Sequence, residues 1–148
     1  MVDNCSSASF TASTSSLGSG AAIAAGLTAS PAQVVRAWSR ALNANDNAAA
    51  AALFAPNARV VQPGVDVVLT SRMLATEFNA ALPCAGRVVA ITVHGNRATA
   101  TFVLGHRPKH RCDGPGLKAA ALFVIRNGKI VLWKQVPVPN PNAGTPTA

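Results

Sequence analysis

The sequence contains no tyrosine and only five acidic residues. Without tyrosine, no phenol can act as an acid, base or nucleophile anywhere in the chain. No uninterrupted run of about 18 apolar residues occurs, so we expect no membrane-spanning helix. The 13 basic residues give a net charge of +8, but they are scattered rather than gathered on one helix. This distribution argues against a nucleic-acid partner.

Composition divides the 148 residues into one domain and two tails. Residues 1–29 are rich in Ser, Ala, Thr and Gly and lack periodicity, which predicts a disordered or loosely ordered tail. Residues 30–137 are expected to fold as one domain, and the Pro/Asn-rich residues 138–148 to leave it. Cys5, in the first tail, is either the remnant of a trimmed secretion signal or an ordinary tail residue.

Residues 30–56 predict two consecutive helices. Ser30 and Gln33 have the spacing of a capping box, in which each side chain accepts from the other residue's amide. Residues 43–46 are expected to end the first helix and to cap the second. The second helix is Ala-rich, and we expect it to include Phe54 and to stop at the proline that follows.

A short hairpin and a third helix are expected next. Residues 58–62 and 65–69 read as strands that flank a Pro-Gly turn. Thr70 or Ser71 can then cap a third helix that Pro83 stops. Its apolar face is predicted to comprise Met73, Leu74, Phe78 and Leu82.

Two long hairpins follow, one turning on Gly95-Asn96 and the other on Asn127-Gly128. Regular pairing in the first hairpin aligns Val93 with Ala98, Ile91 with Ala100 and Val89 with Phe102. Regular pairing in the second, between strands at 118–126 and 129–136, puts Ala120, Leu122 and Val124 on the face of Val131, Trp133 and Gln135. Both sheet faces are then apolar, so we expect helices on one face and a second subunit, forming a homodimer, on the outer one.

This order of elements resembles the SnoaL-like branch of the nuclear transport factor 2-like (NTF2-like) superfamily. The residues that carry the resemblance are Trp38 with residues 41–46, then residues 53–58, residues 127–130 and Trp133. The resemblance implies an α+β conical barrel, with three N-terminal helices packed on a curved antiparallel or mixed β-sheet around an apolar pocket. It also implies that dimers form through the outer sheet face. It does not determine function, because this fold hosts many activities.

Ketosteroid isomerases of this superfamily use a tyrosine and a protonated aspartate as donors and a second aspartate as base. The resemblance places these three positions on Trp38, Ala120 and Gln62, none of which can do that chemistry. An epoxide-hydrolase-like site would need an Asp-Arg-Asp arrangement inside the cone. The five acids fall instead in the tail, a helix cap, loops and the rim of the third helix: Asp3, Asp46, Asp66, Glu77 and Asp113. No catalytic residue is therefore predicted.

Five side chains are candidates for lining the pocket: Trp38, Gln62, Leu122, Trp133 and Gln135. The alternative is a filled core, and large aromatic side chains alone would suit it. Two inward-pointing glutamines favour a pocket, because buried amides need partners that a bound molecule can supply.

The basic loop at 105–116 contains His106, His110, Cys112 and Asp113, whose spacing is compatible with a metal site. The alternating cations Arg107, Lys109 and Arg111 would repel a metal ion, so no metal is expected.

Cys84 precedes the first long strand and Cys112 follows the second, which brings them within one short loop of each other. They are either disulfide-bonded, which favours an exported protein, or two reduced thiols in the cytosol. A nucleophilic Cys84 with His106 as its base lacks a group to orient the imidazole.

The sequence therefore predicts a domain that binds a small, mostly apolar molecule, without a cofactor and without the family's acid–base catalysis. One alternative is an enzyme of the same fold, a polyketide cyclase, an isomerase or an epoxide-hydrolase-like protein. The other is a protein-interaction module that uses the outer sheet face.

Overall fold

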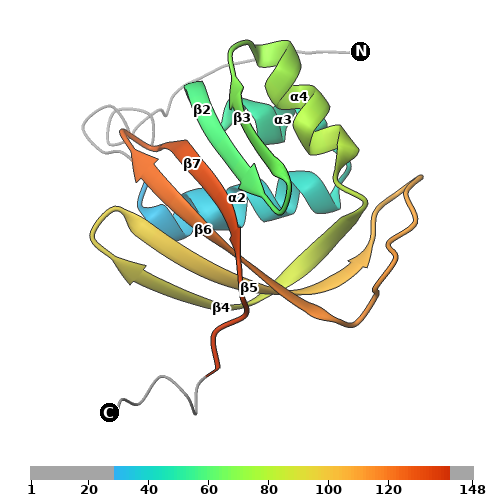
Figure 1. Cartoon of the computed structure of the whole chain (residues 1–148). Coiled ribbons are helices and arrows are strands. Elements are labelled where there is room, and N and C mark those ends of the chain that lie inside the picture. Colours follow the sequence, from blue (N-terminus) through green and yellow to red (C-terminus); the bar gives the residue numbers. More distant parts are fainter. Residues whose placement is uncertain (1–28, 141–148) are drawn as a thin grey trace, which may run out of the picture.

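The computed structural model describes residues 29–140, which form a curved sheet with helices against one of its faces (Figure 1). The helices are α2 (Pro31–Asn43), α3 (Asn47–Ala52) and α4 (Arg72–Ala81). The strands are β2 (Phe54–Gln62), β3 (Val65–Leu69), β4 (Cys84–His94), β5 (Arg97–His106), β6 (Lys118–Arg126) and β7 (Lys129–Val136). They form a six-stranded sheet in the order β3-β2-β7-β6-β5-β4. This is the expected α+β fold.

Neighbouring strands are antiparallel except β2 and β7, which are parallel and make the sheet mixed. Among residues 29–140, no helix combines the length and the hydropathy that crossing a bilayer demands. The predictions for the N-terminal tail, with Asp3 and Cys5, and for residues beyond Asn140 lie outside the described residues.

Helix α2 begins at the predicted capping box. The Ser30 hydroxyl accepts from the Gln33 amide at 3.2 Å, and Gln33 Oε1 accepts from the Ser30 amide at 2.8 Å. The predicted cap of α3 is also confirmed, because Asp46 Oδ1 accepts from the Ala49 amide at 3.0 Å. One face of α2 is buried against the sheet and comprises Val34, Val35, Trp38, Ser39 and Leu42.

The predicted end of the second helix is wrong. Helix α3 stops at Ala52, and Phe54 begins β2. The Ile130 amide donates to the Leu53 carbonyl at 2.8 Å, and Phe54 pairs with Ile130. Pairing with β7 therefore extends the chain before Pro56 is reached, and tertiary contacts override the local helical preference.

The predicted apolar face of the third helix is also wrong in part. Met73 is 69% exposed and Leu74 is 40% exposed, whereas Ala75 and Asn79 are buried. Asn79 can face the core because each polar atom of its side chain has a partner there: Oδ1 accepts from Trp38 Nε1, and Nδ2 donates to the Ala75 carbonyl. A hydropathy pattern cannot identify a buried helix face whose central residue is a polar asparagine.

A bulge at Val131 changes the register of the second hairpin. Ile125 pairs with Ile130 as predicted, but Val124 pairs with Leu132, so Val131 is an extra residue. Phe123 is then opposite Trp133, and Ala121 is opposite Gln135. Ala120, Leu122 and Val124 therefore lie on the outer face, contrary to the prediction, because one extra residue shifts the side-chain alternation.

The first hairpin has a comparable bulge at Val89. The predicted pairs Val93–Ala98 and Ile91–Ala100 are confirmed, but Val88 rather than Val89 lies opposite Phe102. Beyond the bulge, Cys84 pairs with His106.

The core lies between the helices and the inner sheet face and centres on aromatic rings. Trp38 packs edge-on against Phe123, with ring centroids 5.4 Å apart, and lies 6.0 Å from Trp133. Phe78 of α4 packs on Trp133 at 5.3 Å. Such packing buries large apolar areas and fixes the relative positions of α2, α4 and β7.

Candidate functional site

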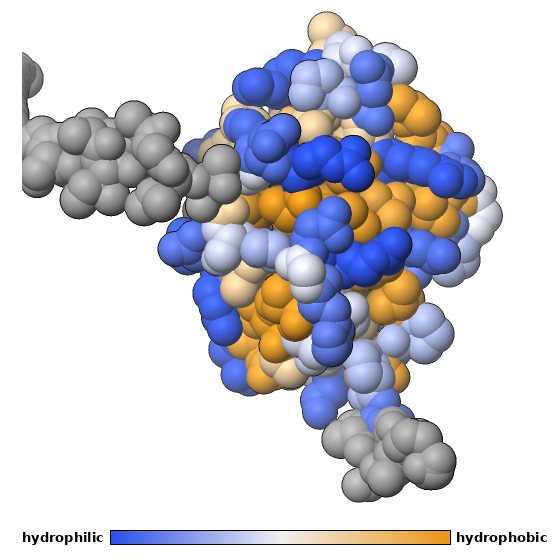
Figure 2. Space-filling view, turned by 90° about the vertical axis from the view of Figure 1, so that its left-hand side faces the viewer, coloured by the Kyte–Doolittle hydropathy of each residue, from blue (hydrophilic) through white to orange (hydrophobic). Residues whose placement is uncertain are grey.

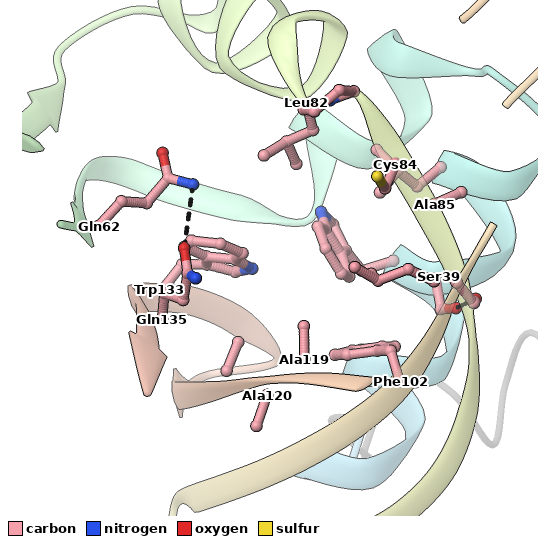
Figure 3. A pocket seen from close by; sticks show the side chains of 16 residues that line it. Ser39, Gln62, Leu82, Cys84, Ala85, Phe102, Ala119, Ala120, Trp133 and Gln135 are labelled. Atoms are coloured by element: carbon pink, nitrogen blue, oxygen red, sulfur yellow. Dashed lines mark hydrogen bonds between the residues drawn. The ribbon is translucent and has the colours of Figure 1, made fainter. Parts of the chain in front are cut away.

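A cavity of about 230 Å³ lies between α2, the end of α4 and the inner face of the sheet (Figure 3). Most of its lining is apolar: Trp38, Leu42, Leu82, Phe102, Leu104, Trp133, and alanines of β4 and β6. The polar side chains among its lining residues are Ser39, Gln62 and Gln135. It is therefore a largely apolar hollow with a few amide, hydroxyl and indole groups.

The structure brings four of the five predicted pocket residues together. Trp38, Gln62, Trp133 and Gln135 line the cavity, but Leu122 does not, because the bulge at Val131 puts it on the outer face. Ala120 borders the cavity, but its side chain points to the other side of β6, while Ala119 projects inward (Figure 3). Ala119 and Ala121, like Ala120, have no acidic side chain, so none of the three can replace the protonated aspartate of the ketosteroid isomerases.

Most polar groups of the cavity already have partners. Trp38 Nε1 donates to Asn79 Oδ1 at 2.8 Å, and the Ser39 hydroxyl donates to the Gly86 carbonyl at 3.1 Å. Gln62 Nε2 donates to Gln135 Oε1 at 3.5 Å, a long and weak contact. The indole nitrogen of Trp133 is buried and has no hydrogen-bond partner among the described residues.

Of the residues found to line the cavity, none is an aspartate, glutamate, histidine, lysine or arginine. Asp46 caps α3, and Glu77 and Asp113 are exposed. Asp66 lies on the surface with Arg59, whose hydrogen bond lowers the pKa of that carboxyl group. The part of the cavity wall that the structure describes thus offers no side chain that transfers protons near neutral pH.

Cys84 and Cys112 form a disulfide, one of the two states that the sequence left open. Cys84 therefore has no free thiol, and a Cys84 nucleophile is excluded in this state. The imidazole Nδ1 of His106 accepts from the Cys112 amide at 2.9 Å. Within residues 29–140, no group of three or more His, Cys, Asp or Glu residues is placed to hold a metal ion.

Arg107, which the sequence analysis treats only as one cation of the basic loop, is buried at the edge of the cavity. It is 3% exposed and donates to the carbonyls of Asn79 at 2.6 Å and Leu82 at 2.7 Å. Its other nitrogen donates to Asn45 Oδ1 at 2.9 Å and to Asn47 Oδ1. Burial lowers the pKa of this guanidinium. Arg107 thus ties the C-terminus of α4 to the α2–α3 turn, and no local sequence signal indicates it.

Gly86 brings β4 against α2 beside the cavity. Its carbonyl accepts from Ser39 and from Asn43 Nδ2, the latter at 2.9 Å, and its amide donates to Asn43 Oδ1 at 3.1 Å. A Cβ atom at this position would lie 3.0 Å from both Phe102 Cβ and the Val103 carbonyl oxygen. The close approach of β4 to β5 at this position therefore favours glycine.

Apolar side chains are also exposed outside the cavity. Figure 2 shows them on the side at the left of Figure 1, in areas separated by bands of hydrophilic residues. On the outer sheet face, Leu122 and Leu132 are half-buried, and Leu122 lies opposite the exposed Lys134. Apolar and basic residues thus alternate on this face.

Residues 35–133 match the SnoaL-like domain family. No curated protein matches the chain. Three solved structures illustrate the structural similarity, and each is less than 25% identical to this chain.

An NTF2-like protein of unknown function from Cytophaga hutchinsonii has a TM-score of 0.61 and 15% identity over 79% of this chain and 97% of its own. A proposed polyketide cyclase from Sinorhizobium meliloti has a TM-score of 0.59 and 20% identity over 70% of this chain and 93% of its own. A protein from Catenulispora acidiphila with a ketosteroid isomerase-like fold was solved in complex with trimethylamine. It has a TM-score of 0.57 and 20% identity over 74% of this chain and 87% of its own. At these identities the similarity shows the fold alone.

Proposed function

Because the chain belongs to the SnoaL-like domain family of the NTF2-like superfamily, we propose that it binds a small, mostly apolar molecule in this cavity without acid–base catalysis. The observation that carries the proposal is the lining of the cavity. Apolar side chains dominate it, and its polar side chains, Ser39, Gln62 and Gln135, are all uncharged. Such a site favours burial of an apolar molecule and orients it through a few hydrogen bonds. The proposal includes no cofactor.

Catalysis of the kind named for some structural relatives is the main alternative. It would need a side chain in the cavity that gains or loses a proton at working pH. By resemblance, the positions that ketosteroid isomerases use for this purpose fall on Trp38, Gln62 and Ala120, whose side chains do not titrate in that range. Turnover of a ketosteroid or polyketide substrate with a bell-shaped pH profile would support this alternative.

A neutral fluorescent probe tests the binding proposal. N-Phenyl-1-naphthylamine brightens when it enters an apolar site, and we expect it to bind the full chain saturably. Ala119→Leu places three extra carbons in the cavity and is expected to weaken binding by at least roughly tenfold. Ala90→Leu makes the same change at an exposed position of β4 and serves as the control.

Two outcomes would contradict the proposal. In the first, the probe does not bind saturably to the unmodified chain. In the second, Ala119→Leu and Ala90→Leu bind it equally well, so that the probe occupies some other surface. Circular dichroism of both variants verifies that the fold is retained.

Homodimerisation through the outer sheet face stays a prediction. Half-buried Leu122 and Leu132 on that face support it, because a second copy would cover them. Light scattering after size exclusion measures the mass directly. Leu122→Glu should shift a dimer to the monomer, whereas the exposed Met73→Glu on α4 should leave the mass unchanged.

Export also stays a prediction, and the Cys84–Cys112 disulfide supports it, because such bonds persist in oxidising compartments.

A further inference from the structure

The two tryptophans of the chain both line the cavity, but their indole nitrogens are in different states. Trp38 Nε1 donates to Asn79 Oδ1, a buried hydrogen bond between α2 and α4. Trp133 is 6% exposed, and its Nε1 is a buried donor without a partner among the described residues. Figure 3 shows this nitrogen at the end of the Trp133 ring that is turned toward Ala119, on the side of the cavity.

A buried donor without a partner is uncommon. More than about nine in ten buried polar groups are hydrogen-bonded, and leaving one unpaired costs roughly 1–3 kcal/mol. The indole nitrogen only donates, so the missing partner must be an acceptor. Since Trp133 lines the cavity, a molecule bound there is the candidate to supply this acceptor.

The lining also restricts the charge of that molecule. No lysine or arginine is among the lining residues to neutralise an anion, and no carboxylate is there to neutralise a cation. An ion would therefore lose its hydration in the cavity without compensation. A neutral acceptor oxygen avoids this loss.

The Trp133 indole and the two glutamines lie along one side of the cavity, whereas the hydroxyl of Ser39, on another side, already donates to the Gly86 carbonyl. Gln135 is two residues after Trp133 on β7 and therefore shares its face, and Gln62 of β2 contacts Gln135. Phe102 and Leu104 of β5 line the cavity with apolar side chains. A ligand with one polar edge and an apolar body matches this arrangement.

We propose that the cavity selects neutral, oxygen-bearing apolar molecules, such as cyclic ketones, whose oxygen accepts a hydrogen bond from Trp133 Nε1. This inference rests on the proposed binding function and adds the chemical class of the ligand. It assigns Trp133 as the residue that determines specificity for the acceptor.

Matched ligands test the inference. Indane and 1-indanone have the same bicyclic skeleton and differ in one carbonyl group. Their dissociation constants are measured by displacement of N-phenyl-1-naphthylamine from the unmodified chain, Trp133→Phe and Trp38→Phe. The ratio of the two constants within each protein removes effects common to both ligands.

We expect Trp133→Phe to reduce the preference for 1-indanone over indane roughly five- to tenfold, the value of one hydrogen bond. Trp38→Phe removes an indole nitrogen that is already bonded to Asn79, so the ratio should stay within about twofold. Absolute affinities are free to change in both variants, because both rings line the cavity.

An NMR measurement gives a second readout that packing alone does not produce. The chain has two indole N–H signals, and Trp38→Phe assigns the one from Trp133. With 1-indanone the Trp133 signal should move downfield, as expected for a new hydrogen bond, and with indane it should not. Signal dispersion in the same spectra verifies folding.

The outcomes separate this inference from the proposed function. If both ligands displace the probe but the ratio is the same in all three proteins, the inference is wrong and the binding function stands. Tighter binding of 1-indanecarboxylate or 1-aminoindane than of 1-indanone would overturn neutral selectivity. If neither the probe nor any of these ligands binds, both proposals fail.

Discussion

The indole nitrogen of Trp38 on α2 donates a 2.8 Å hydrogen bond to the side-chain oxygen of Asn79 on α4, and both residues are buried. Asn79 Nδ2 donates in turn to the Ala75 carbonyl at 2.8 Å, and the Asn79 carbonyl accepts from Arg107. Asn79 therefore joins both helices and the buried arginine. The same bond occupies the polar atom of Trp38, so this residue offers the cavity only its ring.

The first prediction concerns this bond. Asn79→Ala leaves the Trp38 donor unpaired, and Trp38→Phe leaves the Asn79 acceptor unpaired, so each should lower the free energy of unfolding by about 1–3 kcal/mol beyond any loss of packing. Urea unfolding of both variants and of the double variant completes a cycle. The double variant should lose less than the sum, by about 0.5–3 kcal/mol. If the losses of the two single variants add up to the loss of the double variant, the hydrogen bond contributes nothing to stability.

The second prediction concerns the guanidinium at the rim. Arg107→Lys keeps the charge, but a compact ammonium cannot reach the α4 carbonyls and the two asparagines of the α2–α3 turn together. We expect the free energy of unfolding to fall by roughly 2–3 kcal/mol. Arg111→Lys, an exposed change in the same loop, should stay within about 0.5 kcal/mol. Equal urea midpoints for both variants would refute this role of Arg107.

Two glycines that lie close together on the β4–β5 hairpin give the third prediction. Gly86→Ala forces a Cβ atom against Phe102 and Val103, and we expect a loss of about 1–3 kcal/mol. At Gly105 a Cβ atom would meet no atom within 4 Å, so Gly105→Ala should be neutral or stabilising by up to about 1 kcal/mol. Thermal unfolding of the pair measures the difference, and the reverse order would contradict the close approach of β4 to β5 at Gly86.

The fourth prediction concerns the Cys84–Cys112 disulfide, which joins residues separated by 28 positions. Closing a loop of that length restricts the unfolded chain, so reduction by dithiothreitol should lower the free energy of unfolding by about 3–4 kcal/mol. The double variant Cys84→Ala/Cys112→Ala should show the same loss without reductant and no further loss with it. If dithiothreitol leaves the free energy of unfolding of the unmodified chain unchanged, the disulfide does not form.

Local signals predicted much of the fold. The capping box at Ser30 and the Asn127-Gly128 turn act within a few residues, and the structure contains both. Asn127 and Gly128 have φ values of 54° and 75°, as a tight hairpin turn with two left-handed residues requires. Strand bounds on either side of this turn were therefore predictable from sequence.

Features that depend on distant residues were not predictable in the same way. The bulges at Val89 and Val131 arise where the curved sheet changes register, and regular counting from a turn cannot detect them. The bulge at Val131 therefore puts Leu122 on the outer face, whereas Trp133 and Gln135 line the cavity. The burial of Arg107 depends on carbonyls at the end of α4 and on asparagine side chains of the α2–α3 turn, two segments that are distant from it in the sequence.

The parallel pairing of β2 with β7 determines when the sheet can close during synthesis on the ribosome. β2 is translated early, but β7, its neighbour on one side, is the last of the described strands to be synthesised. Until then the nascent chain carries an open strand edge, which invites pairing with other chains. Because β7 also brings Trp133 and Gln135, the cavity wall is completed only by this final step.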